Sequence, residues 1–407
     1  MNIMSSPSTF LCLTCYFKGA DFLTACKSLG NTIYLVTSKK LENEPWPWDD
    51  IDDVYYMEED DEGQWNMTDL LEGLAFIFRS VHIDRILALD DFDVERVALL
   101  REHFRMPGMG QTTARYFRDK LAMRMKAKEG GILVPGFSAL FNDAQIDEFI
   151  MTYPGPWVVK PRSAASAIGI KKVNDPDELW SVLQEAGDER HHHLVEQFLP
   201  GDVYHIDALS VAGKNIFNKT SQYLNTPLEV AHGGGIFRTM TLDDHSADAK
   251  NISKINQELM QVFGMQHSVS HSEYIKSYAD NQYYFLETSS RVGGAHIAEM
   301  VEAATGVNLW TEWAALESAM VRGEAYQLPD LSNYFAGSIM SLSKFEDPDD
   351  SSFQDPEIWW RLKKKNHIGF ILQSSDANRI SELLDHYAQR IMEEFHAAMP
   401  AADRPSN

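Results

Sequence analysis

The sequence predicts a multidomain chain of mixed α/β class. Its 407 residues are enough for two or three domains that fold without disulfide bonds or structural metal ions. Short apolar runs at residues 10–16, 32–37 and 83–88, with an amphipathic stretch at 20–29 between the first two, indicate alternating strands and helices. Farther along the chain, two segments that alternate apolar and polar residues flank a turn at Asp280, which indicates a β-hairpin.

The first domain is expected to span residues 1–110. A helix at 94–104 follows its third strand, and proline and glycine at residues 107–110 then end the pattern. Gly19 stands alone after the first strand, so the G-x-G-x-x-G fingerprint of nicotinamide-dependent dehydrogenases is missing despite the Rossmann-like layering. Residues 42–62, acidic and rich in tryptophan, are expected to form an irregular surface excursion.

The charge balance argues against nucleic acid and anionic membranes as partners. The chain has 36 basic and 60 acidic residues, which gives a formal net charge of −24. Its start has neither the basic residues nor the long apolar stretch of a signal peptide, so we expect a cytoplasmic protein without a membrane span. Cys12, Cys15 and Cys26 make no disulfide framework, and the Cys12–Cys15 spacing has no second pair, so a core strand is the better interpretation.

The next predicted elements carry two lysines and a loop of small residues. A helix at 113–128 carries Lys120, and a buried strand ends at Lys160. The small residues at 161–169 and the strand after them can fold over phosphates as a mobile lid. The strand that starts at residue 194 runs into a Pro-Gly break, where free backbone groups can contact the rim of a heterocycle and Asp202 lies within reach of a ribose.

The hairpin around Asp280 carries two carboxylates. Glu273 and Glu287 are symmetric about the turn, so we expect them opposite each other on one face, together with His271. Like charges so placed are destabilising unless a cation lies between them, and Mg²⁺ suits such oxygen ligands and shares its remaining sites with nucleotide phosphates. Two solvated glutamates on an exposed face are the alternative interpretation.

Glycine-rich segments lie on either side of this hairpin. Arg291 comes four residues after Glu287, in a loop closed by Gly293 and Gly294, where a missing Cβ lets backbone approach a ligand. Together these residues make a site for anionic oxygens. Before the hairpin, His232 starts a run of three glycines, for which closure over a substrate is preferred to an unstructured linker.

The remaining segments are expected to serve packing. Residues 247–263 and 301–321 have apolar residues at helical spacing. Strands at 334–343 and 368–373 and a helix at 377–398 are expected to form a closing subdomain.

The order and spacing of these pieces resemble the ATP-grasp superfamily over roughly residues 1–320. The phrase E-T-S-S-R-V-G-G-A-H after H-S-E resembles its carboxylate–amine ligases, especially the L-amino-acid (dipeptide) ligase branch. The resemblance implies a chain of α/β and α+β domains in which antiparallel sheets grip ATP. Its parts would be a Rossmann-like pre-ATP-grasp domain (1–110), an ATP-grasp domain (111–330) with a lid subdomain at about 151–205, and a closing subdomain (331–407).

The resemblance also implies roles for individual residues. Contacts to the phosphates, adenine and ribose of ATP fall to Lys120, Lys160, Ser163, Ser166, Glu196, Phe198, Leu199, Asp202 and Leu286. Mg²⁺ (or Mn²⁺) would be held by Glu273, Glu287 and Ser289, and substrate by His271, His232, Gly293 and Gly294. Arg291 and Lys160 would be the catalytic groups, with Arg291 on the acyl-phosphate or a substrate carboxylate.

Two positions depart from the family pattern. Many members have asparagine at the position of Ser289. Serine is a shorter and neutral ligand, which puts full two-metal coordination in question. The lid lacks the common Gly-Ser pair, and Ser163 and Ser166 are its substitutes.

The predicted activity is that of an ATP-dependent ligase. A carboxylate is phosphorylated to an acyl-phosphate, an amine attacks, and ADP and phosphate leave. Amino acids are the expected substrates. The resemblance also implies a homodimer, since members of the family are often dimers. No side-chain nucleophile is required, and no spacing favours one. A catalytically silent ATP-binding or regulatory protein is one alternative, motivated by Ser289. An ATP-grasp enzyme with bicarbonate or a phosphorylated acceptor is another, and the single arginine seen near the glycine turn disfavours the phosphorylated acceptor.

Overall fold

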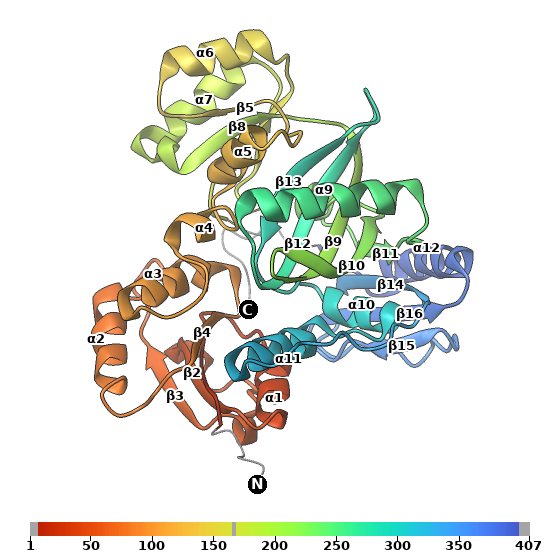
Figure 1. Cartoon of the computed structure of the whole chain (residues 1–407). Coiled ribbons are helices and arrows are strands. Elements are labelled where there is room, and N and C mark those ends of the chain that lie inside the picture. Colours follow the sequence, from red (N-terminus) through yellow and green to blue (C-terminus); the bar gives the residue numbers. More distant parts are fainter. Residues whose placement is uncertain (1–6, 165–167, 399–407) are drawn as a thin grey trace.

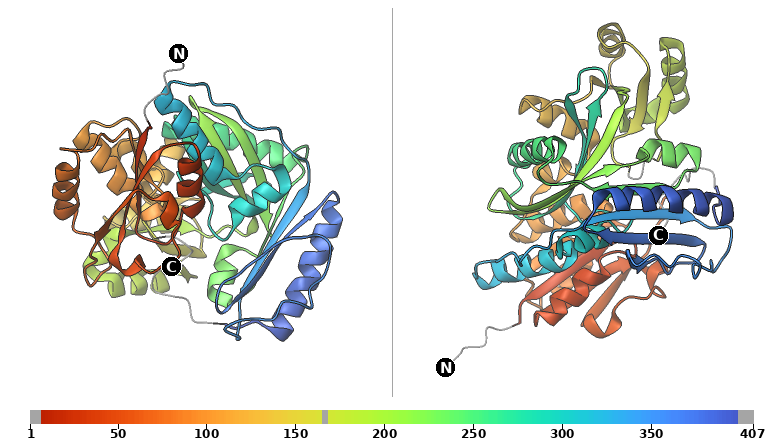
Figure 2. Two further views of the ribbon diagram at one scale, coloured as in Figure 1. Left: turned by 90° about the horizontal axis from the view of Figure 1, so that it is seen from below. Right: turned by 90° about the vertical axis from the view of Figure 1, so that its right-hand side faces the viewer.

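The computed structural model describes residues 7–164 and 168–398, which form three β-sheets with helices around them. The N-terminal sheet and a small sheet formed by residues 137–197, which we call the lid sheet, lie at opposite ends of the molecule, with a large central sheet between them (Figures 1 and 2). The predicted mixed α/β multidomain fold is confirmed. Among the described residues, no helix is long and apolar enough to cross a membrane.

The N-terminal sheet has parallel strands in the order β3-β2-β1-β4. Its elements are β1 (Thr9–Thr14), α1 (Ala20–Ser28), β2 (Thr32–Ser38), η1 (Lys39–Leu41), η2 (Trp48–Asp50), β3 (Asp53–Met57), α2 (Met67–Ile77), β4 (Arg85–Ala88), η3 (Asp91–Asp93) and α3 (Val94–Phe104). The three predicted strands and both predicted helices are confirmed, and Cys12 lies in the core with a free thiol. The prediction for residues 42–62 is wrong, because β3 pairs there with β2. One exposed and four half-buried residues give too short a pattern to detect.

The lid sheet is antiparallel, with the order β5-β8-β6-β7. Its elements are β5 (Phe137–Ala139), α6 (Asp143–Thr152), β6 (Trp157–Pro161), β7 (Lys171–Val173), α7 (Pro176–Ala186), η4 (Gly187–His192) and β8 (His193–Gln197). The single helix predicted at 113–128 is wrong, because α4 (Gln111–Arg115) and α5 (Lys120–Glu129) are separate. The Asp119 carboxylate accepts a hydrogen bond from the backbone N–H of Leu121 at 2.9 Å and so begins α5 anew.

The central sheet is antiparallel, with the order β13-β12-β9-β10-β11-β14-β16-β15. Its strands are β9 (Gly201–Val211), β10 (Lys214–Tyr223), β11 (Phe237–Thr241), β12 (Ser268–Ser277), β13 (Tyr283–Ser289), β14 (Phe335–Leu342), β15 (Ile358–Arg361) and β16 (His367–Ser374). Its helices are α8 (Pro227–Gly233), α9 (Ala247–Phe263), α10 (Ile297–Thr305), α11 (Leu309–Arg322) and α12 (Ala377–Glu394).

One detail around this sheet differs from expectation. The helix predicted at 301–321 is split into α10 and α11, because Gly306 ends α10 at a φ of 76°. The strands and the helix predicted after residue 331 are confirmed as β14, β16 and α12, and β14 joins the central sheet by pairing with β11. The division of the chain into domains at residues 110 and 330 stays a prediction.

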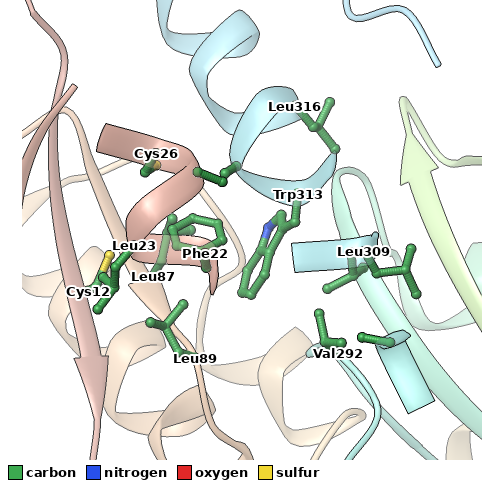
Figure 3. Close-up of a cluster of buried hydrophobic side chains, with 14 of the residues drawn as sticks. Cys12, Phe22, Leu23, Cys26, Leu87, Leu89, Val292, Leu309, Trp313 and Leu316 are labelled. Atoms are coloured by element: carbon green, nitrogen blue, oxygen red, sulfur yellow. The ribbon is translucent and has the colours of Figure 1, made fainter. Parts of the chain in front are cut away.

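A shared hydrophobic cluster joins the N-terminal sheet to the central sheet (Figure 3). The ring centroids of Phe22 in α1 and Trp313 in α11 are 4.9 Å apart, and Cys12 and Leu87 pack in the same buried cluster as Val292. Burial of this much apolar surface holds the two parts together. The contact also brings the segment after β4 next to the loop that follows β13.

Candidate active site

A cavity of about 770 Å³ lies where the three sheets meet. This volume suits a small-molecule ligand. Among its lining residues are most of those predicted from the sequence: Lys120, Lys160, Glu196, Phe198, Leu199, Asp202, His271, Glu273, Leu286, Glu287, Ser289, Arg291 and Gly294. The functional roles of these residues stay predictions, but the structure brings them together around one cavity.

The two hairpin glutamates face each other. Pairing of β12 with β13 places Glu273 opposite Glu287, as predicted from the symmetry about Asp280. Glu273 accepts a hydrogen bond from the Tyr223 hydroxyl at 2.8 Å, and Glu287 lies 3.0 Å from the Lys120 ammonium. Both side chains line the cavity, so the alternative of two solvated glutamates on an outer face is wrong.

The charge state of Glu287 fits a metal ligand. Burial raises the pKa of this carboxyl, but Lys120 and Lys160 outweigh burial, and the net pKa lies below the usual value. Glu287 is therefore ionised at neutral pH. Two facing carboxylates with one ammonium beside them form the oxygen-rich donor set that Mg²⁺ prefers.

Ser289, the third predicted metal ligand, has a partner that the sequence did not reveal. Its hydroxyl donates a hydrogen bond to Asp91 in η3. The same carboxylate pairs with Arg291, whose Nε lies 2.8 Å from Oδ2. Burial raises the pKa of Asp91, and Arg291 together with other cations outweighs it, so the pKa lies below the ordinary value. A residue two hundred positions earlier in the chain thus fixes both the serine and the arginine.

Lys160 lies in a buried ion-pair cluster. Its ammonium pairs with Glu196, whose other oxygen accepts from Arg124 Nε at 2.9 Å. Burial lowers the pKa of Lys160 to about 8 even though Glu196 opposes the shift. Because its carboxylate is committed to two cations, Glu196 holds Lys160 in place, and its predicted contact with adenine stays a prediction.

Arg124 is a residue that the sequence analysis missed. It follows Lys120 by one helical turn in α5, is fully buried, and has two guanidinium nitrogens without a partner among the described residues. The i, i+4 spacing from Lys120 was the available signal.

The predicted nucleoside end of the cavity is apolar. Leu199 and Leu286 pack against a small hydrophobic cluster that includes Val203 and Ile275. Near this end, the Asp202 carboxylate accepts a hydrogen bond from the Tyr278 hydroxyl at 2.8 Å. An apolar slot with a carboxylate at its rim is compatible with a base and a ribose.

The lid and glycine predictions have mixed outcomes. Ser163 is not among the residues that line the cavity, and Ser166 lies outside the described residues. The alternative of an unstructured linker is wrong at residues 232–233, because they end α8, which starts with a capping box between Thr226 and Glu229. Closure of this segment over a substrate stays a prediction. The side chain of His232 lies outside the described part of the chain.

Gly293 has a packing reason to be glycine. A Cβ at this position would lie 2.8 Å from Asp207 Oδ1 and 3.1 Å from His271 Nδ1. The predicted glycine turn therefore closes over these two side chains, and Gly293 itself does not line the cavity.

His271 is the end of a hydrogen-bond chain behind the glutamates. Its Nδ1 and the Nδ1 of His205 each lie 2.8 Å from a different oxygen of Asp207. Burial lowers the pKa of His271, but Asp207 outweighs it and the pKa rises to about 10. The Nε2 of His271 lies 3.6 Å from Glu273, so this histidine supports the carboxylate pair.

The ligand atoms of His205, Asp207 and His271 are close enough to hold a metal ion, because they lie within 4.8 Å of one another. Hydrogen bonds argue against such a site. The Thr239 hydroxyl donates to the Gln222 carbonyl, so its oxygen is left to accept from His205 Nε2. The Nδ1 of His205 lies beside Asp207, so a metal ion on either ring nitrogen would have to displace an existing contact of this histidine.

The sequence is similar to amino-acid ligases. No protein-family model matches it. An L-arginine-specific L-amino acid ligase of Bacillus subtilis is 24% identical over 233 residues, which cover 56% of each chain. A D-alanine–D-alanine ligase of Chromobacterium violaceum is 30% identical over 97 residues, which cover 24% of this chain and 32% of the relative. The chain thus spans about half or less of these curated relatives.

Solved structures match nearly the whole chain. The L-amino acid ligase from Bacillus licheniformis has a TM-score of 0.75 over 96% of this chain and 98% of that chain, at 16% identity. N5-carboxyaminoimidazole synthetase from Staphylococcus aureus, solved in complex with ADP, has a TM-score of 0.70 over 94% and 96%, also at 16% identity. Likeness at such low identity establishes the fold.

Proposed function

Because the chain has the ATP-grasp fold and is similar in sequence to carboxylate–amine ligases of that superfamily, we propose that it is an ATP-dependent ligase. In this proposal it joins a small carboxylate to an amine and releases ADP and phosphate. The observation that carries the proposal is the facing pair Glu273 and Glu287 in one cavity with Lys120, Lys160 and Arg291. Amino acids are the proposed substrates, since the names of the sequence relatives specify them.

The cations of the cavity hold the phosphates of ATP. Lys120 donates to the carbonyl of Ala164 at 2.6 Å and Lys160 pairs with Glu196, so both ammonium groups are fixed before ATP binds. Such preorganised charge stabilises a transition state without reorganisation at the moment of reaction. Mg²⁺ bound by Glu273 and Glu287 would add positive charge at the transferred phosphoryl group.

Arg291 is placed to bind an anionic group of the substrate or intermediate. Three of its five N–H groups are used, two by Asp91 and one by the carbonyl of Val292. The other two are available for a carboxylate or acyl-phosphate oxygen. Asp91 fixes the plane of the guanidinium, which favours a defined orientation of the bound anion.

The reaction needs activation of the carboxylate, because hydroxide is a poor leaving group. A carboxylate oxygen attacks the γ-phosphorus, the bond to the β,γ-bridging oxygen breaks, and ADP leaves. The amine then attacks the acyl carbon, phosphate leaves with the electron pair, and the nitrogen gives up a proton. The side chains supply position and charge, and none forms a covalent bond.

The test is consumption of MgATP in the presence of pools of amino acids and other small carboxylates, with mass spectrometry of all products. ADP, phosphate and a condensed amide are expected. AMP with pyrophosphate would overturn the acyl-phosphate route. Tight ATP binding without turnover in every pool would favour a catalytically silent nucleotide-binding protein.

A further inference from the structure

Arg118 is a buried cation in the cavity that the mechanism above does not use. It lies between α4 and α5, lines the cavity, and has only 8% of its surface exposed. Its guanidinium carbon lies 4.3 Å from the ring centroid of Phe92. Among the described residues, no carboxylate lies within ion-pair distance of Arg118 and no acceptor takes a hydrogen bond from its side chain.

The other cations of the cavity differ from Arg118 in this respect. Lys120 pairs with Glu287, Lys160 with Glu196, and Arg291 with Asp91. An uncompensated charge in a nine-tenths buried position is costly, and guanidinium groups do not escape that cost by losing a proton. The arrangement therefore calls for an anion at this end of the cavity.

We propose that Arg118 binds the carboxylate of the amine substrate, which makes the acceptor an amino acid and the product a dipeptide. This inference rests on the ligase function proposed above and names the class of one substrate. The guanidinium offers a planar fork of N–H donors that matches a carboxylate, and the Phe92 ring holds that plane.

The local charge favours a carboxylate over a phosphate. Arg118 and Arg291 both act electrostatically on Asp91, so the three groups are neighbours at one end of the cavity. Two guanidinium groups and one carboxylate leave a single positive charge, since Lys18, which also acts on Asp91, is neutralised by its ion pair with Asp90 at 2.7 Å. A carboxylate carries one negative charge, whereas a phosphate monoester carries about −1.5 to −2 at neutral pH. Arg118 is a second arginine in the cavity beside Arg291, so the charge balance, and not the number of arginines, disfavours a phosphorylated acceptor.

The experiment compares Arg118→Gln with a matched control, Arg115→Gln. Arg115 lies three residues earlier, its side chain is 64% exposed, and it pairs loosely with Glu95 at 3.6 Å. Both variants lose one positive charge, but only one loses it from the cavity. ADP release is measured with the twenty proteinogenic L-amino acids as donors, with each acceptor offered as the free acid or as its carboxamide.

For the wild type we expect free-acid acceptors to be preferred. Arg118→Gln should lower kcat/KM for these acceptors by about 10- to 100-fold, the loss of a charge-assisted hydrogen bond. The carboxamide rates and the KM for ATP should stay within about twofold, and Arg115→Gln should match the wild type. Arg118→Lys, which keeps the charge without the planar fork, should recover part of the loss.

Other outcomes overturn the inference. A raised KM for ATP in Arg118→Gln would assign the residue to the nucleotide, and an equal loss for acids and carboxamides would make it structural. If the wild type releases no ADP with any pair, the ligase proposal fails, and calorimetric titration with MgADP and free amino acids decides separately on Arg118. Binding of free amino acids to the wild type but not to Arg118→Gln supports the carboxylate site. The inference is overturned if amino acids do not bind to the wild type, or if the substitution weakens binding of inorganic phosphate more than binding of amino acids.

Discussion

Removal of the Glu196 charge tests whether the buried cations of the cavity depend on one carboxylate. In Glu196→Gln the side chain keeps nearly its size, but Lys160 and Arg124 lose their shared partner. Arg124 is fully buried and already has two guanidinium nitrogens without a hydrogen-bond partner in the described part of the chain. The nearby carboxylate of Glu287 is already paired with Lys120, so it is a poor replacement partner.

The expected destabilisation follows from this burial. Breaking a buried ion pair by removal of one partner costs about 3–5 kcal/mol. An unfolding entropy of about 2.1 cal/mol/K per residue over 407 residues gives roughly 0.85 kcal/mol/K. If all residues unfold together, Tm should fall by about 4–6 °C, and a smaller cooperative unit gives a larger fall.

Differential scanning calorimetry without nucleotide measures this shift. Glu185→Gln is the matched control, because Glu185 is 70% exposed and pairs with the exposed Lys171 at 2.7 Å. Loss of such a surface pair costs about 0–1 kcal/mol, or roughly 1 °C here. Equal melting temperatures for the two variants would refute the idea that Glu196 compensates a buried charge cluster.

Three further predictions concern the metal pair, the phosphate cation and the histidine behind them. Glu287→Gln should reduce ADP release by at least about 100-fold. It should also remove the difference in Tm between the ADP complex with Mg²⁺ and the ADP complex with EDTA. An unchanged difference in Tm would contradict the role of Glu287 as a metal ligand. ATP affinity should fall as pH rises above about 8, where Lys160 loses its proton, and calorimetric titration from pH 7 to 9.5 should show a flatter profile for Lys160→Arg. Burial lowers the pKa of His271, but the Asp207 carboxylate outweighs burial and raises this pKa to about 10 in the folded chain. The stabilisation that protonated His271 gives the fold is therefore complete below the unfolded pKa of about 6.5 and is lost as pH rises through 10. Asp207→Asn should therefore lower Tm more at pH 7 than at pH 10, and an equal loss at both would remove the linkage.

The parts of the site that lie in one hairpin could be predicted from the sequence. Glu273 and Glu287 pair because the strands alternate at period two about a short turn, and this geometry is local. Lys160 was found because it ends a strand next to a loop of small residues, whereas Lys120 was found from the order of the motifs along the chain. Local periodicity also gave α9 and α3 with the bounds that the structure shows.

Elements marked by short or competing signals were missed. The glycines after His232 suggested a loop, but the capping residues Thr226 and Glu229 and a proline at the first turn start a helix that runs into them. The helix predicted across residues 113–128 was broken by Asp119, whose carboxylate caps α5. In both cases a cap outweighed the periodicity or the glycine content.

Contacts between sheets could not be predicted at all. Asp91 and Arg118 come before the motifs that indicated the site, and their proximity to Arg291 depends on how the N-terminal sheet packs against α11. Such packing is the sum of many apolar contacts and has no signature in any single motif. Asp91 and Arg118, which lie at the proposed substrate end of the cavity, therefore could not be identified from the sequence.

The departure at Ser289 shows what this means for the chemistry. From the sequence, Ser289 is interpreted as a weakened metal ligand, which suggested the alternative of a catalytically silent ATP-binding protein. In the structure its hydroxyl donates to Asp91, the carboxylate that also orients Arg291. One side chain from the segment after β4 thus connects the proposed metal end of the cavity to its proposed substrate end, so loss of an amide ligand at position 289 is no evidence against the proposed function. Under that proposal, activity should depend on the docking of the N-terminal sheet as well as on the hairpin that carries the glutamates.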